Sequence, residues 1–412
     1  MPRFLSLAAA MFLCLLVLEE ELWLGPACRE VQAFLLLLPW AWSWRWVRIC
    51  DRGGFPREAG IPTLLLLPVF LYSLFMIPAG GGRWLVGLNQ QSPFLATWAG
   101  LAPFLWILAA SHWGESALLG VPSGRRRRFV ARQLVGQFLV MIPFSLVTQV
   151  HAWGRSLFPE NAELEGGWPY LAVLALEVLP ILLILPPVVM LLPKALGAVP
   201  GTSLWQQVVA RMWRGRGRPP RVQDWDPGVA LPNALALAVG PWRRILVSRS
   251  LQGMLRIEEM EAVLAHELSH LERRHGRSLL LGFLGAILLA DIGLRWLWGS
   301  SLPWYWAWLP LVLAAFPFLL ASRVFEMEAD LDAAARDPSL EAGLVGALTL
   351  LGRRTQAIGF RHFSPSRRVA EIEWAGREPH RRAYWQRRAK LCRGIMRGLF
   401  LAGLAGLLGE TL

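Results

Sequence analysis

Two histidines and a glutamate lie close together in the stretch 261–276, which reads Glu-Ala-Val-Leu-Ala-His-Glu-Leu-Ser-His-Leu-Glu-Arg-Arg-His-Gly. His266, Glu267 and His270 form the pattern H-E-x-x-H. On a helix, residues four apart share a face, so both imidazoles can bind one zinc ion. The adjacent Glu267 can then accept a proton from a water on that metal. The pattern predicts a hydrolytic zinc site; the competing interpretation is a surface helix with ordinary polar histidines.

The charges around this stretch favour a helix. Acidic residues stabilise the first turns of a helix and basic residues the last. Three glutamates lie at or just before the start of the stretch and two arginines lie near its end: Glu258, Glu259, Glu261, Arg273 and Arg274. We expect the helix to stop at Gly276, because glycine is common just past a helix end. We expect His275 to be a surface or capping residue and not a metal ligand.

A catalytic zinc commonly takes three protein ligands, so a third must come from elsewhere in the chain. The candidate is Glu326, in the sequence Ser-Arg-Val-Phe-Glu-Met-Glu-Ala-Asp at 322–330. Two apolar runs, 278–298 and 303–321, precede it, and an out-and-back hairpin would return Glu326 to the histidine helix. Asp330, one helical turn later, can hydrogen-bond a histidine ligand and fix its tautomer. The alternative is an amphipathic helix with ordinary surface acids.

Two β-like runs, 229–239 and 244–248, precede the histidines and are joined at Gly240-Pro241. Pro232 has no N–H to donate, which restricts the first run to the edge of a sheet. An edge strand near a hydrolytic zinc can bind an extended peptide by backbone pairing. The compatible alternative is a hairpin that only covers the catalytic helix. Upstream, the Arg-, Gly- and Pro-rich stretch 194–226 is predicted to be a membrane-hugging linker.

The composition indicates an integral membrane protein. Of the 412 residues, 55% are hydrophobic and 17% are charged, whereas soluble domains carry about 25% charged residues. Apolar runs lie at 4–18, 31–47, 61–79, 93–112, 129–150, 168–193, 278–298 and 303–321, and a shorter one at 398–408. The formal net charge is +13, and nearly all of the positively charged residues are arginines. Clustered arginine in a membrane protein marks the cytoplasmic loops, so we expect no nucleic-acid partner.

Basic and non-basic loops alternate along the eight longer runs, which places the N-terminus and the loop with both histidines in the cytoplasm. The four cysteines show no C-x-x-C spacing and indicate neither a disulfide framework nor a cysteine metal site.

The motifs resemble a known family. H-E-x-x-H followed, after a hydrophobic hairpin, by S-R-x-x-E-x-x-A-D is similar to the membrane zinc endopeptidases. These include the bacterial heat-shock protease HtpX, the CAAX prenyl endopeptidase and the mitochondrial inner-membrane stress protease. Residues 232–236 resemble the P-N-A-x-A segment of that family, and His362, Ser364-Pro365 and Arg367-Arg368 resemble its late His-Pro…Arg element. The likeness covers residues 225–375, and the proline of the late element is displaced from its place after the histidine.

The resemblance implies a role for each matching residue around the metal. His266, His270 and Glu326 would bind one zinc ion per chain. Glu267 would be the general base and then the proton donor to the leaving amine. Asp330 would support a ligand without touching the metal itself.

The resemblance also implies residues that handle the substrate. Asn233 and Ala236 would belong to the strand that pairs with it. His362 and Arg368 would stabilise the oxyanion or order the site, and Arg367 could take the place of Arg368.

The expected fold is all-α dominated: an integral membrane multi-span helical bundle with a gluzincin-like catalytic domain at the cytosolic face, containing a small β-hairpin. Its parts are a membrane block at 1–193, the linker, hairpin and H-E-x-x-H helix at 194–277, a transmembrane hairpin at 278–321, the second half of the peptidase domain at 322–394, and a short apolar segment at 395–412.

The expected activity is peptide-bond hydrolysis in membrane or membrane-proximal proteins at the cytoplasmic face of a multi-pass, bacterial inner-membrane enzyme. Its partners would be a protein or peptide substrate and the lipid bilayer. Two alternatives stay open. One is a sensor-transducer that cleaves a single regulator in response to a signal, and the other is a non-catalytic membrane scaffold with a vestigial zinc site.

Overall fold

Two compact units make up the chain. The computed structural model describes residues 28–51, 68–137 with several short gaps, 187–298 with gaps of a few residues, 308–354 and 363–409. The first unit comprises 1–164, 168–196 and 227–230, and the second comprises 165–167, 197–226 and 231–412.

In the first unit two long helices, α2 (Arg29–Asp51) and α5 (Pro93–Leu118), pack against each other. The rings of Trp40 and Trp106 meet across this contact with centroids 5.2 Å apart. The indole N–H of Trp106 donates to the Leu36 carbonyl at 3.1 Å. Within the described residues, one helix is long and apolar enough to cross a membrane, at Leu95–Leu118 in α5.

The predicted multi-span bundle is only partly covered by the described residues. The apolar run 31–47 falls within α2 and 93–112 within α5. The other four runs of the proposed membrane block lie wholly or largely outside the described part of the chain: 4–18, 61–79, 129–150 and 168–193. The six-span block therefore stays a prediction.

The second unit contains a four-stranded sheet with the order β1-β2-β4-β3. Its strands are β1 (Val199–Pro200), β2 (Arg221–Trp225), β3 (Ala234–Val239) and β4 (Trp242–Ser248). β3 and β4 form the predicted antiparallel hairpin, and β3 lies at the edge of the sheet, as the proline before it requires. β2 pairs with β4 in parallel.

The prediction of a linker at 194–226 is wrong, because this stretch contains β1, β2 and the helix α8 (Ser203–Met212). α8 buries Trp205, Val208 and Val209 on one face. That face packs with β2, β4 and the helix that carries the histidines. This stretch is ordered by its contacts with β4 and the histidine helix, which lie later in the chain. Its local composition could not show these contacts.

The histidine helix, α10 (Ile257–Glu272), lies between two cores. Its Leu264 and Leu268 pack with α8 and the sheet, whereas Ala262 and Ala265 pack with the C-terminal helices. At the start of α10, the Glu259 carboxylate accepts a hydrogen bond from the Arg256 backbone N–H at 2.9 Å. Backbone N–H groups at the start of a helix have no acceptor within the helix, and this contact supplies one. A helix held on two sides presents its side chains from a rigid base.

The end of α10 differs from the prediction. The helix stops at Glu272, and the next helix, α11 (His275–Trp298), begins three residues later and not after Gly276. Between them Arg274 adopts φ 57°, a left-handed conformation that costs a non-glycine residue about 1–2 kcal/mol. This turn redirects the chain, so His275 lies on a new helix axis.

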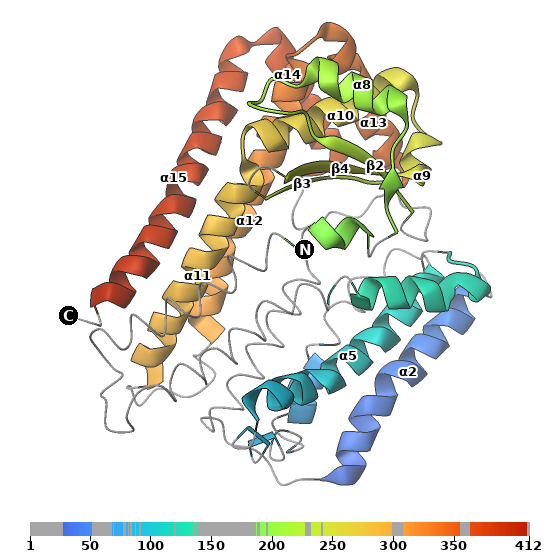
Figure 1. Cartoon of the computed structure of the whole chain (residues 1–412), viewed down its shortest axis with the longest axis vertical. Coiled ribbons are helices and arrows are strands. Elements are labelled where there is room, and N and C mark those ends of the chain that lie inside the picture. The colour runs from blue at the N-terminus through green and yellow to red at the C-terminus, as the bar shows by residue number, and fades with distance from the viewer. Residues whose placement is uncertain are drawn as a thin grey trace. The chain divides into compact units, whose positions relative to one another are not determined.

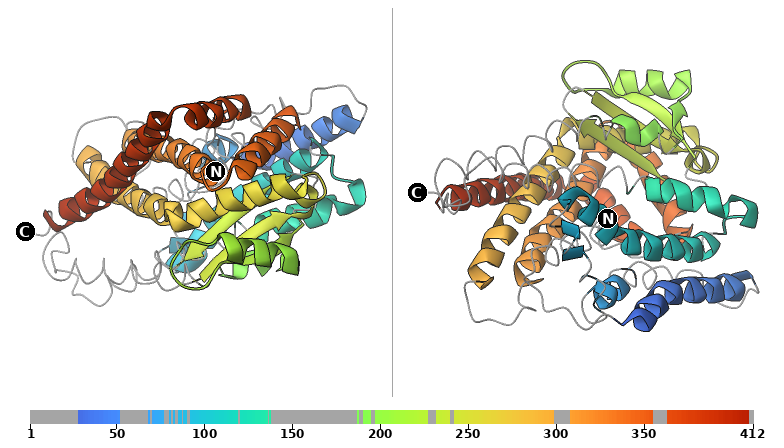
Figure 2. Two further views of the ribbon diagram at one scale, coloured as in Figure 1. Left: turned by 90° about the horizontal axis from the view of Figure 1, so that it is seen from above. Right: turned by 60° about the horizontal axis from the view of Figure 1, so that its bottom comes forward.

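α11 and α12 (Trp308–Ala334) pack against each other as the two arms of a hairpin (Figures 1 and 2). The rings of Phe283 and Phe318 meet between them with centroids 6.5 Å apart. α12 continues beyond the apolar run and packs against α10. The hairpin thus returns the chain to the histidine helix, as the sequence predicted.

The described part of the second unit has four further helices: the short α9 (Arg249–Gln252), α13 (Pro338–Arg354), α14 (Pro365–Arg377) and α15 (Pro379–Gly409). α13 approaches α10 closely at Gly343, where an added Cβ would lie 2.6 Å from the Glu258 carbonyl oxygen. α15 runs along α11 (Figures 1 and 2). It is continuous through the short apolar run at 398–408, which is therefore the end of a long helix and not a separate segment.

Candidate metal centre

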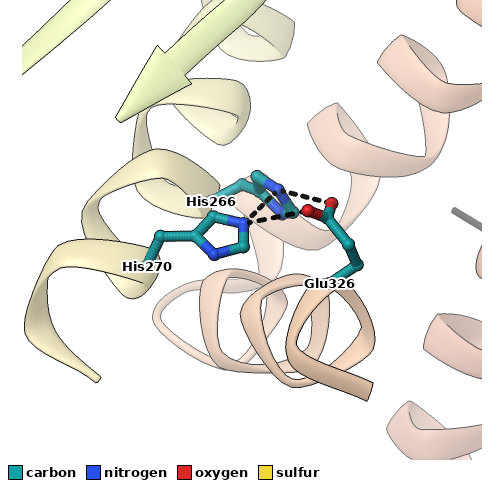
Figure 3. A group of neighbouring side chains, drawn as sticks. All are labelled: His266, His270 and Glu326. Atoms are coloured by element: carbon teal, nitrogen blue, oxygen red, sulfur yellow. Dashed lines mark hydrogen bonds and ion pairs between the residues drawn. The ribbon is translucent and has the colours of Figure 1, made fainter. Parts of the chain in front are cut away.

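Three side chains converge where α12 meets α10. His266 and His270 lie on one face of α10, and Glu326 reaches them from α12 (Figure 3). Nε2 of His270 lies 3.1 Å from Nε2 of His266. Carboxylate oxygens of Glu326 lie 3.5 Å from Nε2 of His266 and 3.7 Å from Nε2 of His270. The structure therefore brings together the three residues that the sequence named as ligands.

The spacing of these atoms suits a tetrahedral metal ion. Zinc binds imidazole nitrogen and carboxylate oxygen at about 2.0–2.2 Å, which separates tetrahedral ligands by roughly 3.3–3.6 Å. The three observed separations, 3.1, 3.5 and 3.7 Å, bracket that range. Two imidazoles and one carboxylate are also a common donor set of catalytic zinc, with a fourth position left to water. The residues present fit a zinc ion.

A carboxylate and an arginine lie behind His266. Oδ1 of Asp330 is 2.9 Å from Nδ1 of His266. Asp330 is fully buried and accepts two hydrogen bonds from the Arg368 guanidinium of α14, each 2.6 Å long. This contact leaves Nε2 of His266 facing Glu326 and His270.

The charges in this group shift one another's pKa values. Burial tends to raise the pKa of Asp330, but Arg368 and His266 outweigh it and hold the pKa below its usual value of 3.8. Burial tends to lower the pKa of His266, but Asp330 and Glu326 raise it to about 10. These carboxylates stabilise positive charge at the site, whether it is a proton or a metal ion.

A second buried group lies behind His270. Nδ1 of His275 is 2.9 Å from Nδ1 of His270, and Nε2 of His275 is 2.8 Å from the Glu328 carboxylate. Burial lowers the pKa of His275 below 6.5, although Glu328 acts in the opposite direction. The prediction that His275 is a surface or capping residue is wrong, because the turn at Arg274 points it inward, where it is 1% exposed.

The remaining predicted site residues lie at different places. Glu267 is buried beside His266 on α10. Burial acts to lower the pKa of Arg368, but Asp330 above all, with Glu326 and Glu267, raises it. Asn233 precedes β3, and Ala236 lies within it. His362 lies outside the described residues.

Arg367, the alternative to Arg368, lies away from this group. Its guanidinium carbon is 4.3 Å from the centre of the Phe363 ring. Of the two neighbouring arginines, Arg368 is therefore the one that reaches Asp330.

Comparison with known proteins finds a matching family model and similar solved structures. The model of Peptidase family M48 matches residues 205–373. The crystal structure of S. mikatae Ste24p is similar at a TM-score of 0.44 and 14% identity, over 82% of this chain and 97% of that chain; a likeness of this size does not establish a shared fold. No curated protein matches the chain. The matched residues contain α10, the hairpin of α11 and α12, and all three candidate ligands, and this chain carries a Peptidase family M48 domain at 205–373.

Proposed function

We propose that this chain is a zinc-dependent membrane endopeptidase. One zinc ion would be held by His266, His270 and Glu326. The observation that carries the proposal is the set of three separations between possible ligand atoms, with Oε2 of Glu326 facing His266 and Oε1 facing His270. These separations lie close to the edge lengths of a zinc tetrahedron, in a peptidase-family domain. A vestigial site would have no reason to keep this geometry, which argues against a non-catalytic scaffold.

When bound, zinc would supply a water of lowered pKa and a Lewis acid for the substrate carbonyl. A carboxylate oxygen of Glu267 would accept a proton and then donate it to the leaving amine, a role that typically contributes 10²–10⁴-fold to a rate. Asp330 would keep His266 in the tautomer whose Nε2 carries a lone pair, and Arg368 would hold Asp330 in place. Arg368 thus orders the site through Asp330, which is one of the two roles expected of it.

The edge strand β3 supports a role in substrate binding. Asn233 pairs with Ser248, since its carbonyl accepts the Ser248 N–H and its own N–H donates to the Ser248 hydroxyl, both at 2.8 Å. In an antiparallel ladder, alternate residues turn their N–H and C=O groups away from the partner strand. By the observed register, Ala236 is one of these outward residues. We propose that an extended substrate pairs with Ala236, whereas Asn233 serves the hairpin itself.

Location at the cytoplasmic face of a membrane rests on the charge pattern of the sequence. Arginine-rich segments alternate with apolar runs, and the helix α5 is long enough to span. We propose that the substrates are membrane or membrane-proximal proteins. A bacterial inner membrane is the expected setting.

The test compares purified wild type with Glu267→Gln in detergent, using an unfolded protein as substrate and measuring bound zinc on both. Glu261→Gln is the matched control, because it makes the same change on the same helix at a residue paired with the exposed Arg211. We expect wild type and Glu261→Gln to cleave, Glu267→Gln to lose at least 100-fold in rate, and all three to hold about one zinc.

Two results would contradict the proposal. Wild-type activity in Glu267→Gln would remove the proposed base, and absence of zinc from the wild type would remove the metal site. If no variant cleaves while all hold zinc, the sensor-transducer with one substrate becomes the better description, and a membrane-protein substrate library is then the assay.

A further inference from the structure

His270 has a buried partner of its own that the proposed mechanism does not use. His275 is the first residue of α11, and its side chain is almost fully inaccessible at 2% exposure. Its Nδ1 lies 2.9 Å from Nδ1 of His270. Its other ring nitrogen, Nε2, lies 2.8 Å from Oε2 of Glu328. The ring therefore bridges a candidate zinc ligand and a buried carboxylate.

The bridge continues to the last helix. Glu328 lies two residues after Glu326 on α12 and is 2% exposed. Two guanidinium nitrogens of Arg393, on α15, contact its carboxylate at 2.5 and 3.2 Å. The closer of these nitrogens contacts Oε2, the same oxygen that faces Nε2 of His275. The paired cation stabilises the ionised carboxylate, which remains an acceptor toward His275.

The carboxylate fixes the order of protons along this bridge. An ionised Glu328 only accepts hydrogen bonds, so Nε2 of His275 must donate to it. Nδ1 of a neutral His275 then carries a lone pair, which can only accept a hydrogen bond from the Nδ1–H of His270. A neutral His270 that donates from Nδ1 carries its own lone pair on Nε2, the atom that faces His266 and Glu326.

Backbone and packing hold the His275 ring in this position. The left-handed Arg274, at φ 57°, sets the direction in which α11 departs. The His275 ring stacks on Phe325 with centroids 4.5 Å apart and planes 3° apart. Phe325 is adjacent to Glu326, so the stack joins the ring to the same segment of α12 that supplies the carboxylate ligand.

We propose that His275, Glu328 and Arg393 form a positioning relay that sets the tautomer and orientation of His270 for metal binding. The inference rests on the proposed zinc site and adds to it. It makes the site two-sided: Asp330 and Arg368 serve His266, and His275, Glu328 and Arg393 serve His270. None of the three relay residues touches the metal or the substrate.

His275 could instead serve only to stabilise the fold, and the variant His275→Phe distinguishes that role from the proposed positioning of His270. Phenylalanine keeps an aromatic ring stacked on Phe325 but cannot accept from His270 or donate to Glu328. The measurement is the zinc dissociation constant of the full-length protein in detergent, from competition with a chromophoric chelator. The thermal melt of the metal-free protein is recorded beside it, and Ser278→Ala, at another buried position on α11, is the control.

We expect His275→Phe to bind zinc 10- to 100-fold more weakly, the usual loss when a hydrogen-bond partner of a metal ligand is removed, with a metal-free melt close to that of Ser278→Ala. Glu328→Gln is a second, isosteric variant. Its amide either turns an N–H toward His275, which reverses the proton order, or accepts from His275 through an uncharged oxygen, which holds the ring less strongly. In both orientations it should weaken zinc binding. Arg393→Met should do so to a smaller extent.

Zinc affinity within twofold of wild type in both His275→Phe and Glu328→Gln would overturn the relay and leave the proposed peptidase intact. Absence of zinc from the wild type would overturn both the relay and the proposed function. If His275→Phe fails to fold, Glu328→Gln decides the matter on the same measurement.

Discussion

Replacing Arg368 with methionine tests whether this arginine acts through Asp330 or on the substrate. Its side chain is 14% exposed and that of Asp330 is fully buried. Methionine removes both 2.6 Å hydrogen bonds to Asp330 and leaves a buried carboxylate that faces only the His266 imidazole. Removing one partner of a buried ion pair costs about 3–5 kcal/mol.

The expected loss can be measured as a melting temperature. For a domain of about 150–250 residues, 1 kcal/mol shifts the melting temperature by about 2–4 °C. Arg368→Met should therefore melt roughly 6–20 °C below wild type. Arg367→Met is the control, because Arg367 stacks on Phe363 and pairs with no acid of the metal centre; its change should stay within about 1 kcal/mol.

A double variant sharpens the test. Asp330→Asn combined with Arg368→Met leaves neither charge unpaired, so its loss should be smaller than the sum of the single losses. Zinc affinity should fall in Arg368→Met as well, since His266 loses its fixed support. A variant with wild-type melting and zinc affinity but much slower turnover would refute the reasoning and assign Arg368 to the oxyanion.

Two further predictions concern ion pairs outside the metal centre. Glu371 accepts two hydrogen bonds from Arg381. Burial acts to raise the pKa of Glu371, but these bonds hold the pKa below 4.5. The stabilising effect of the ionised Glu371 is therefore present above pH 4.5 and is lost as the pH falls through the lowered pKa. Melting curves from pH 6 to pH 3 should fall more steeply for wild type than for Glu371→Gln, and parallel curves would contradict this. The side chain of Arg336 is 2% exposed and pairs with Glu272 at 2.6 Å, so Arg336→Ala should cost about 3–5 kcal/mol of stability. Arg211→Ala, at an exposed ion pair, should cost at most about 1 kcal/mol. Equal melting temperatures for the two variants would contradict the claim that the Arg336 pair is the more stabilising one.

The candidate metal centre could be predicted from the sequence because its geometry follows from two local rules. Helical periodicity places His266 and His270 on one face, and two apolar runs of similar length return the chain to its starting side. Both rules act over short ranges of sequence and need no knowledge of distant partners. The edge position of β3 was predictable in the same way, from a proline at 232.

His275 was missed because the sequence hides the break in the helix before it. On a continuous helix, residues five apart point about 140° away from each other, so His275 would have faced away from His270. The left-handed Arg274 interrupts the helix and reverses that relation. The sequence signal available was only a third histidine in a stretch that already held two.

The contacts of Arg393 and of β2 were also not predictable from the sequence, and the reason differs from that for His275. Arg393 meets Glu328 across 65 residues, and β2 pairs in parallel with a strand that follows it. Contacts of this kind depend on the packed unit, and arginine-rich sequence around them favours a linker or a surface helix equally well.

Arg368 on α14 pairs with Asp330, and Arg393 on α15 pairs with Glu328. Both arginines come well after the three candidate ligands in the chain. A ribosome makes the chain from its N-terminus, so the nascent protein holds both histidines and Glu326 before it holds either arginine. Asp330 lacks its cation until α14 has docked, and Glu328 lacks its cation until α15 has docked, so the ligands are without these supports until then. If the chain is the endopeptidase proposed above, its metal ligands would be held in place only at the end of synthesis, and it would not cleave while it is itself an unfolded polypeptide.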